Sequence, residues 1–185
     1  LEQLLTMCAE AVTVKNFTSI TIVGDGSCFW RSILAHFEKY QLIDYLRWLA
    51  DEYRERVFRS FPEHQELYQE VLDALTCGYF PLDKQLVMFL KVITAIHILE
   101  KRQDYRYIPL DGLTLEEWVA QFVLEYDTWA DHEAIKAVAD VMNINIHIHK
   151  HTRETLIIKG VGRCAFADVH VFYSGTHYSL LLHQQ

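Results

Sequence analysis

The sequence predicts an α+β domain in which helices come first and a small, mostly C-terminal β-sheet follows. Hydrophobic residues recur with the period of a helix over much of residues 1–142, and apolar and polar residues alternate with the period of a strand after Asn143. The composition agrees, because 51% of the 185 residues are hydrophobic and only 7 are Gly and 3 are Pro. Such a chain favours long regular elements around one core, so we expect a single domain over residues 1–185.

The first expected element is a helix over residues 1–12, whose apolar residues have the spacing of one helical face. A short apolar stretch at residues 20–23 leads into the turn Gly24-Asp25-Gly26-Ser27. The glycines of this turn permit positive φ, and its Asp and Ser can bond to nearby backbone amides. Helical spacing returns over residues 28–40, so Cys28 stands where the turn meets the helix.

Three further helices are expected between residues 43 and 100, with breaks near Pro62 and at residues 78–81. Residues 86–99 are apolar except for Lys91, Thr94 and His97. This stretch is shorter than the roughly 20 residues that span a bilayer, so it predicts a buried helix and no membrane span.

The next helix has a clear start, because Thr114 and Glu117 form a capping-box pattern ahead of apolar residues at helical spacing. Another helix begins at Thr128 or Asp131 and runs toward Met142. Strands are expected from residue 144, where isoleucines alternate with polar residues, and at residues 155–158, 169–173 and 177–182.

Charge and cysteine spacing limit the partners and cofactors. The net charge is -8 and the chain has no run of Lys or Arg, which argues against nucleic acid and favours a basic protein partner. The four cysteines have neither zinc-knuckle nor redox-motif spacing, so we expect free thiols, a reducing compartment, no metal and no cofactor. No secretory signal is visible at the start of the sequence.

Cys28 is the residue best placed for chemistry. Free amides and the positive end of a helix dipole favour an anion at a helix start, so its thiolate should be stabilised and its pKa lowered. The backbone amides of Gly26, Ser27 and Cys28 could stabilise the oxyanion of an acyl-transfer intermediate. A thiol nucleophile also needs a base, and His177, between a turn and a strand, is the best placed of 10 histidines. Without a motif, a small buried hydrophobe would be the preferred interpretation of Cys28.

Three blocks of sequence supply that motif. Residues 24–33, with Asp-Gly-x-Cys, two bulky apolar residues, Arg and a small residue, resemble the nucleophile signature of the ovarian tumour (OTU) family of cysteine proteases. Residues 128–148 are similar to that family's loop, helix and strand before the catalytic His, and residues 175–180 are similar to its terminal His-Tyr segment. The resemblance implies a papain-like αβα fold and a thiol protease that cleaves ubiquitin from proteins or from polyubiquitin chains.

By the same resemblance, Cys28 is the nucleophile and His177 the general base. Many relatives carry Asp or Asn two residues after the His, whereas this chain has Ser179, whose hydroxyl can orient the ring but supplies no charge. Asp25 matches the acidic residue of the nucleophile loop, and we assign it the third role; capping of the Cys28 helix is its alternative role.

The helical segment of about residues 43–110 departs from the family pattern as an enlarged insert. It forms either an arm that grips ubiquitin or a helical layer that completes the core. Four acidic residues of this segment either face ubiquitin or form a solvated helix face: Glu63, Glu66, Glu70 and Asp73. His147, His149 and His151 have a spacing that can bind zinc, but the strand pattern already explains them and no metal is expected.

The sequence therefore predicts a deubiquitinase that needs no cofactor, acts as a monomer and is cytoplasmic, in the host cytosol if it is a viral or bacterial effector. Two alternatives stay open. One is a papain-like protease or acyltransferase that acts on another protein modifier. The other is a non-catalytic ubiquitin-binding pseudoenzyme, which Ser179 favours and the Cys28–His177 pair opposes.

Overall fold

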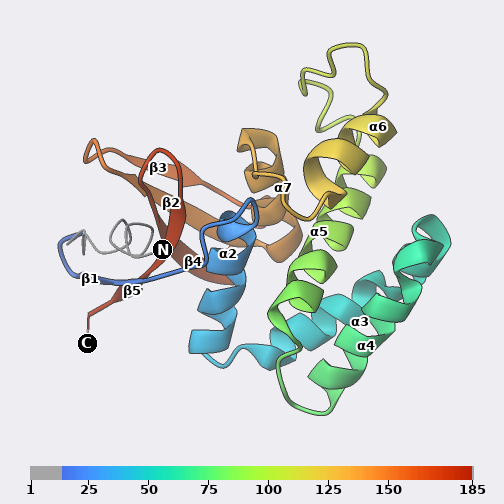
Figure 1. The fold of residues 1–185 in the computed structure, drawn as a ribbon, viewed down its shortest axis with the longest axis horizontal. Helices are drawn as coiled ribbons and strands as arrows, with labels where there is room; N and C mark the ends of the chain where they lie inside the picture. The colour runs from blue at the N-terminus through green and yellow to red at the C-terminus, as the bar shows by residue number, and fades with distance from the viewer. Residues whose placement is uncertain (1–13, 185) are drawn as a thin grey trace, which may run out of the picture.

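A computed structural model describes residues 14–184 of the chain (Figure 1). The helix expected over residues 1–12 lies outside this range. In chain order the elements are β1 (Phe17–Ile20), α2 (Cys28–Lys39), α3 (Ile43–Ser60), the short 3₁₀ turn η1 (Pro62–His64), α4 (Gln65–Thr76), α5 (Asp83–Glu100), α6 (Leu115–Val119), the π-helical turn η2 (Ala120–Leu124), α7 (His132–Met142), β2 (Ile144–Lys150), β3 (Thr155–Ile158), β4 (Ala167–Tyr173) and β5 (Tyr178–His183).

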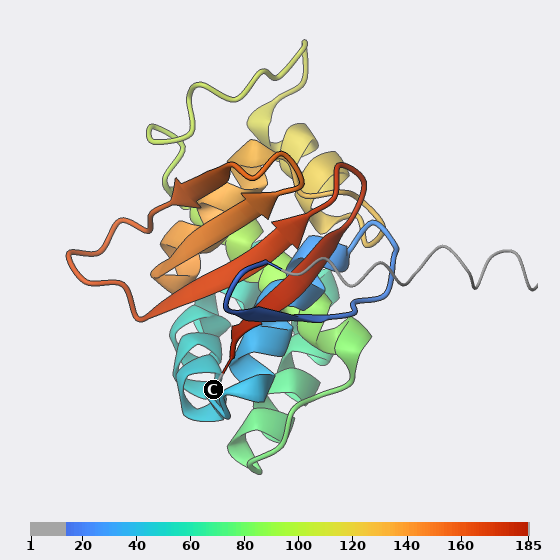
Figure 2. The ribbon, with the colours of Figure 1, turned by 90° about the vertical axis from the view of Figure 1, so that its left-hand side faces the viewer.

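The sheet is mixed, with strand order β1-β5-β4-β2-β3 (Figure 2). Strands β2 and β4 run parallel, and the other neighbouring pairs are antiparallel. Four of its five strands follow α7, which confirms the expected C-terminal sheet. The N-terminal strand is Phe17–Ile20, so the apolar stretch at residues 20–23 mostly follows it.

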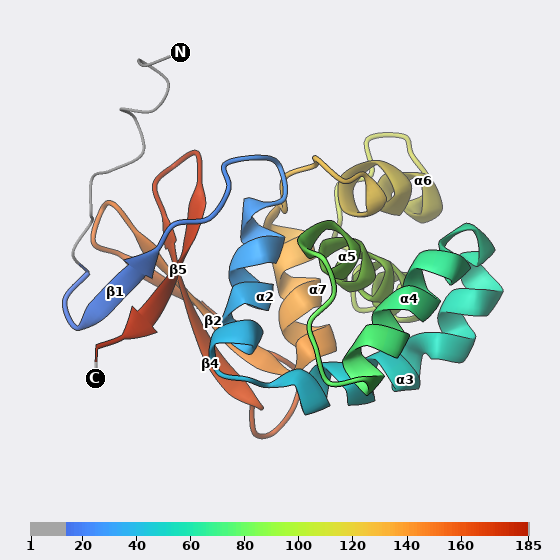
Figure 3. The ribbon, with the colours of Figure 1, turned by 60° about the horizontal axis from the view of Figure 1, so that its bottom comes forward.

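The helices of residues 14–184 gather on one face of the sheet, with α2 and α7 next to the strands and α3, α4, α5 and α6 beyond them (Figures 1 and 3). On β2 the side chains of Ile144, Ile146 and Ile148 are buried, whereas those of the alternating polar residues are partly exposed. The period of 2 in the sequence thus separates a helix-covered face from a more polar one. A mostly C-terminal sheet covered by helices confirms the predicted fold class.

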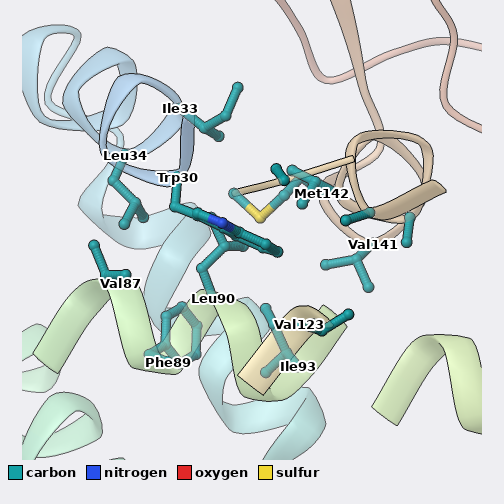
Figure 4. Packing of buried hydrophobic residues seen from close by; sticks show 14 of the residues in the cluster. Trp30, Ile33, Leu34, Val87, Phe89, Leu90, Ile93, Val123, Val141 and Met142 are labelled. Carbon is teal, nitrogen blue, oxygen red and sulfur yellow. The ribbon is translucent and has the colours of Figure 1, made fainter. Parts of the chain in front are cut away.

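The core between the helices centres on Trp30 of α2, which packs among residues of α5 and α7 such as Leu90 and Met142 (Figure 4). Helix α5 is buried on nearly every side, as its apolar sequence predicts. It therefore fills the core. No helix within residues 14–184 combines the length and the hydrophobicity that crossing a membrane requires.

Local signals in the sequence set most of the helix boundaries. Both hydrogen bonds of the Thr114 capping box are formed, and the Asp131 side chain caps α7 by accepting from the amide of Ala134. Asn143 ends α7 in the left-handed region, with φ of 46°, and turns the chain into β2. One expectation is wrong in detail: regular α-helix ends at Val119, and residues 120–124 continue as a π-turn.

Candidate active site

The helix that carries Cys28 begins with a tight turn. The amide of Cys28 donates to the carbonyl of Asp25 at 3.2 Å, and the amide of Arg31 donates to the carbonyl of Ser27 at 3.0 Å, which starts α2. Ser27 occupies the N-cap position, but its hydroxyl donates to the carbonyl of Tyr126 instead of capping the helix. The turn is therefore attached to a segment about a hundred residues later in the chain.

Strand β5 brings the predicted base to the thiol. The amide of Tyr178, the residue after His177, donates to Sγ of Cys28 at 3.4 Å. The His177 ring lies against Gly24, where a Cβ in place of the hydrogen would stand 3.7 Å from the ring Nδ1. The loop before α2 and the turn before β5 meet at the same end of the sheet (Figures 2 and 3). The fold thus brings Cys28 and His177 together, although no hydrogen bond joins the sulfur to the ring within residues 14–184.

Burial controls the ionisation of both groups. It raises the pKa of the Cys28 thiol, against the amides of Tyr178 and Phe29, which lower it. The expected lowering of this pKa at the helix start is therefore wrong, because loss of hydration outweighs the favourable amides. Burial also lowers the pKa of His177, against a hydrogen bond with the Ile22 backbone and the charge of Asp25, which raise it. At neutral pH these shifts favour a neutral thiol at Cys28 and a neutral imidazole at His177.

Asp25 does not contact the base as expected. Its Oδ1 accepts from the amide of Ser27 at 2.9 Å and from the guanidinium of Arg31. Burial alone would raise the pKa of Asp25, but these two hydrogen bonds and the Arg31 charge hold it below its usual range. Within residues 14–184 Asp25 makes no hydrogen bond to His177, which corrects the orienting role expected for it. Its charge raises the pKa of His177.

The three expected oxyanion donors are not equally available. The amides of Ser27 and Cys28 already donate to Asp25, and the amide of Gly26 is the one with no acceptor in the described part of the chain. Gly26 is also confined, because a Cβ there would overlap the carbonyl of Asp127. Binding of an oxyanion by all three amides requires a rearrangement of this turn.

Ser179 follows the strand pattern without reaching the base. It lies on β5 opposite Phe172, and within residues 14–184 its hydroxyl forms no hydrogen bond to His177. The backbone of Ile22 raises the pKa of the ring, as a nearby acceptor does. Sequence reasoning missed Ile22, because a backbone carbonyl leaves no signal in the residue type.

Sequence reasoning also missed a polar network around the turn. Arg31 contacts Asp25, Asp83 at 2.6 Å and the hydroxyl of Tyr126, and thereby joins α2 to α5 and to the segment before α7. Lys91 of α5 contacts the same segment from below the turn. Its signal was present in the sequence, since Lys91 is the one charged residue of an otherwise apolar stretch.

The histidines of the sheet make hydrogen bonds outside the groups described above. His147 bonds Asp168 at 2.8 Å, and His149 and His170 share a hydrogen bond at 2.9 Å. Among residues 14–184 no set of three or more ligating side chains is arranged to hold a metal ion.

Solved structures that are similar to this one include OTU domains, so the chain has the OTU fold. A chain of the "h/ceOTUB1-ubiquitin aldehyde-UBC13~Ub" structure matches with a TM-score of 0.77 and 16% identity, covering 89% of this chain and 76% of that one. The OTUD1 OTU domain matches with a TM-score of 0.51 and 17% identity, covering 90% and 86%. The viral OTU domain protease from Dera Ghazi Khan virus matches with a TM-score of 0.53 and 15% identity, covering 91% and 82%.

These likenesses lie in the fold and not in the overall sequence. No protein-family model matches the chain, and no curated protein matches it by sequence. With identities near 16%, the neighbours establish the architecture, and the chemistry rests on the residues of this site.

Proposed function

We propose that this protein is a thiol hydrolase that cleaves the peptide or isopeptide bond after the C-terminal glycine of ubiquitin. The observation that supports the proposal is the contact of Cys28 Sγ, the one buried free thiol of the described residues, with the amide of Tyr178, the residue after His177. Several OTU-fold neighbours were solved with ubiquitin or ubiquitin aldehyde, which supports ubiquitin as the substrate class.

The proposed reaction uses the neutral pair directly. Sγ of Cys28 attacks the glycine carbonyl while the thiol proton passes to His177, and the new C–S bond leaves an oxyanion near the Gly26 amide. Collapse breaks the C–N bond, and the imidazolium returns the proton to the leaving amine. Water then hydrolyses the thioester with His177 as base, which regenerates the thiol.

The decisive test is a ubiquitin probe with a thiol-reactive C-terminus. Wild type should form a covalent adduct at Cys28, identified by peptide mapping, and Cys28→Ala and His177→Ala should not. A panel of diubiquitin linkages would then show whether isopeptide bonds are cut. Adducts on Cys77 or Cys164, which are exposed, would contradict the nucleophile assignment.

A non-catalytic ubiquitin-binding protein is the second candidate. Three observations favour it: the Ser27 and Cys28 amides are occupied, the thiol pKa is raised, and the chain has Ser179 at the position where many OTU proteases carry Asp or Asn. Binding of unmodified ubiquitin by calorimetry, together with no adduct and no diubiquitin cleavage, would support this candidate. A probe adduct with another modifier, but none with ubiquitin, would indicate the third possibility, a hydrolase for that modifier.

A further inference from the structure

Lys91 is a fully buried cation that the proposed chemistry does not use. It lies midway along α5, and its side chain has no exposed surface. Its Nζ donates to the carbonyls of Glu125 at 2.6 Å and Tyr126 at 2.8 Å, with the carbonyl of Thr128 at 3.5 Å. A buried ammonium is costly to desolvate, so its presence in an apolar helix requires such compensating acceptors.

The segment that Lys91 binds, residues 125–128, is the one that touches the nucleophile turn. The hydroxyl of Ser27 donates to the Tyr126 carbonyl, and the backbone of Asp127 packs so closely on Gly26 that no side chain fits between them. Lys91 and Ser27 therefore share an acceptor, the Tyr126 carbonyl. This single carbonyl therefore connects Lys91 of α5 to Ser27, the residue before Cys28.

Aromatic rings and carboxylates near the ammonium also favour its positive charge. The faces of Trp30 and Tyr126 lie 5.1 Å and 6.0 Å from Nζ. Burial lowers the pKa of Lys91 to about 8, while the carboxylates of Asp127, Asp25 and Glu125 raise it and the Arg31 charge lowers it. Lys91 is thus a cation at neutral pH, held among carbonyls, π faces and nearby acids.

We propose that Lys91 is a positioning residue, whose ammonium holds residues 125–128 against Gly26 and Ser27 and so fixes the turn that presents Cys28. Without the ammonium, the carbonyls of Glu125 and Tyr126 lose a buried donor and turn toward water. The backbone of Asp127 then no longer packs against Gly26. Its effect on catalysis rests on the proposed function. Its effect on the order of the turn and on the reactivity of Cys28 does not depend on ubiquitin.

The test replaces Lys91 by methionine, which keeps the length and apolar stem but has no donor. Hydrogen exchange, read by mass spectrometry at neutral pH, should rise in the peptides of residues 24–28 and 125–128 and stay at wild-type level in the sheet. Iodoacetamide should alkylate Cys28 about tenfold faster, because a loosened turn exposes the thiol to the reagent more often. Labelling by the ubiquitin probe should slow by about 10- to 100-fold, as expected for a misplaced reacting group.

The matched control is Ile98→Ala, which removes a buried side chain from the same helix seven residues further on. It should lower the melting temperature but leave local exchange at residues 24–28 and Cys28 alkylation unchanged. The proposal is overturned if Lys91→Met keeps wild-type exchange and alkylation, or if Ile98→Ala changes them equally at a matched melting temperature. If the wild-type protein forms no adduct with the ubiquitin probe but Lys91→Met still loosens the turn, the proposed function is wrong. The positioning role of Lys91 then stands.

Discussion

The backbone amide of Tyr178 hydrogen-bonds the sulfur of Cys28 across 150 positions of sequence, at 3.4 Å. This bond attaches the nucleophile at the start of α2 to the start of β5. Strand β5 is itself held in register between β1 and β4, so the position of His177 relative to the thiol depends on the pairing of the whole sheet. The bond also opposes, without reversing, the rise in thiol pKa that burial causes.

The raised thiol pKa predicts how Cys28 reacts with a small alkylating agent. Because burial disfavours the thiolate, the rate of Cys28 alkylation should keep increasing with pH beyond the ordinary thiol value of about 8.5. Peptide mapping of iodoacetamide adducts over pH 6 to 10, with Cys28→Ser as the blank, measures the midpoint. A midpoint near neutral pH would contradict this prediction and would show that the helix start stabilises the thiolate.

Gly26→Ala tests the close packing of the turn. The new methyl group would overlap the carbonyl of Asp127, so either the turn or the 125–128 segment must move. We expect kcat/KM for a ubiquitin substrate to fall by about 100-fold, as a displaced nucleophile predicts. The control is Gly112→Ala, where φ is 90° and space is open, which should cost about 1 kcal/mol of stability with normal kinetics. Equal kinetics for the two variants would show that the packing at Gly26 is dispensable.

Variants of Asp25 and Ser179 distinguish the effect of a nearby charge on His177 from the effect of a neutral hydroxyl. Asp25→Ala removes the acceptor of Arg31 and of the Ser27 amide, and we expect a loss in kcat/KM of about 100-fold or more. Since the Asp25 charge raises the pKa of His177, its removal should also move the acidic limb of the pH profile to lower pH.

Ser179→Ala should lose less than about tenfold, because within residues 14–184 its hydroxyl forms no hydrogen bond to His177 and even one neutral hydrogen bond is worth no more than that. Circular dichroism checks that both variants fold. A larger loss for Ser179→Ala than for Asp25→Ala would make the hydroxyl the orienting group.

The sheet histidines predict sensitivity to acid. Burial and the neighbouring imidazoles of His147 and His149 lower the pKa of His170 to about 4. The unfolded state then binds more protons than the folded state between about pH 6.5 and pH 4, so stability falls as pH falls through this window.

His170→Gln should reduce the drop in melting temperature across that window by about 2–4 °C, roughly 1 kcal/mol for a domain of this size. His36 also has its pKa lowered to about 4 by burial, so His36→Gln tests a second source of the same slope. An unchanged slope in both variants would assign acid sensitivity to other groups.

Glu66→Lys tests whether the helical insert grips substrate. Glu66 is exposed on α4, which lies beyond α5 from the nucleophile turn (Figure 3). We expect the melting temperature and KM to stay at wild-type values, because a reversed surface charge far from the site alters neither the core nor the turn. A severalfold rise in KM at constant kcat would instead establish a substrate-binding arm.

Sequence patterns predicted most of the described elements and singled out Cys28 and His177 as candidate reactive residues. The Thr114 capping box, the alternating isoleucines of β2 and the apolar α5 each depend on contacts close in the chain or on burial of one face. Cys28 and His177 carry chemistry in their residue types and lie in recognisable blocks, so their juxtaposition could be expected before the fold was known. In the structure the amide of Tyr178, the residue after His177, donates to the sulfur of Cys28.

Only the tertiary structure decided the pKa values of the site residues and the contacts that fix the nucleophile turn. The pKa of a thiol depends on the water that packing removes, so burial of Cys28 outweighs the helix start and the Tyr178 amide, which would lower it. Asp25 pairs with Arg31 because the turn points its carboxylate along α2, and a sequence does not show where a side chain points. The ammonium of Lys91 meets carbonyls more than thirty residues away, and backbone acceptors of that kind are common to every residue type. Their convergence exists only in the folded chain.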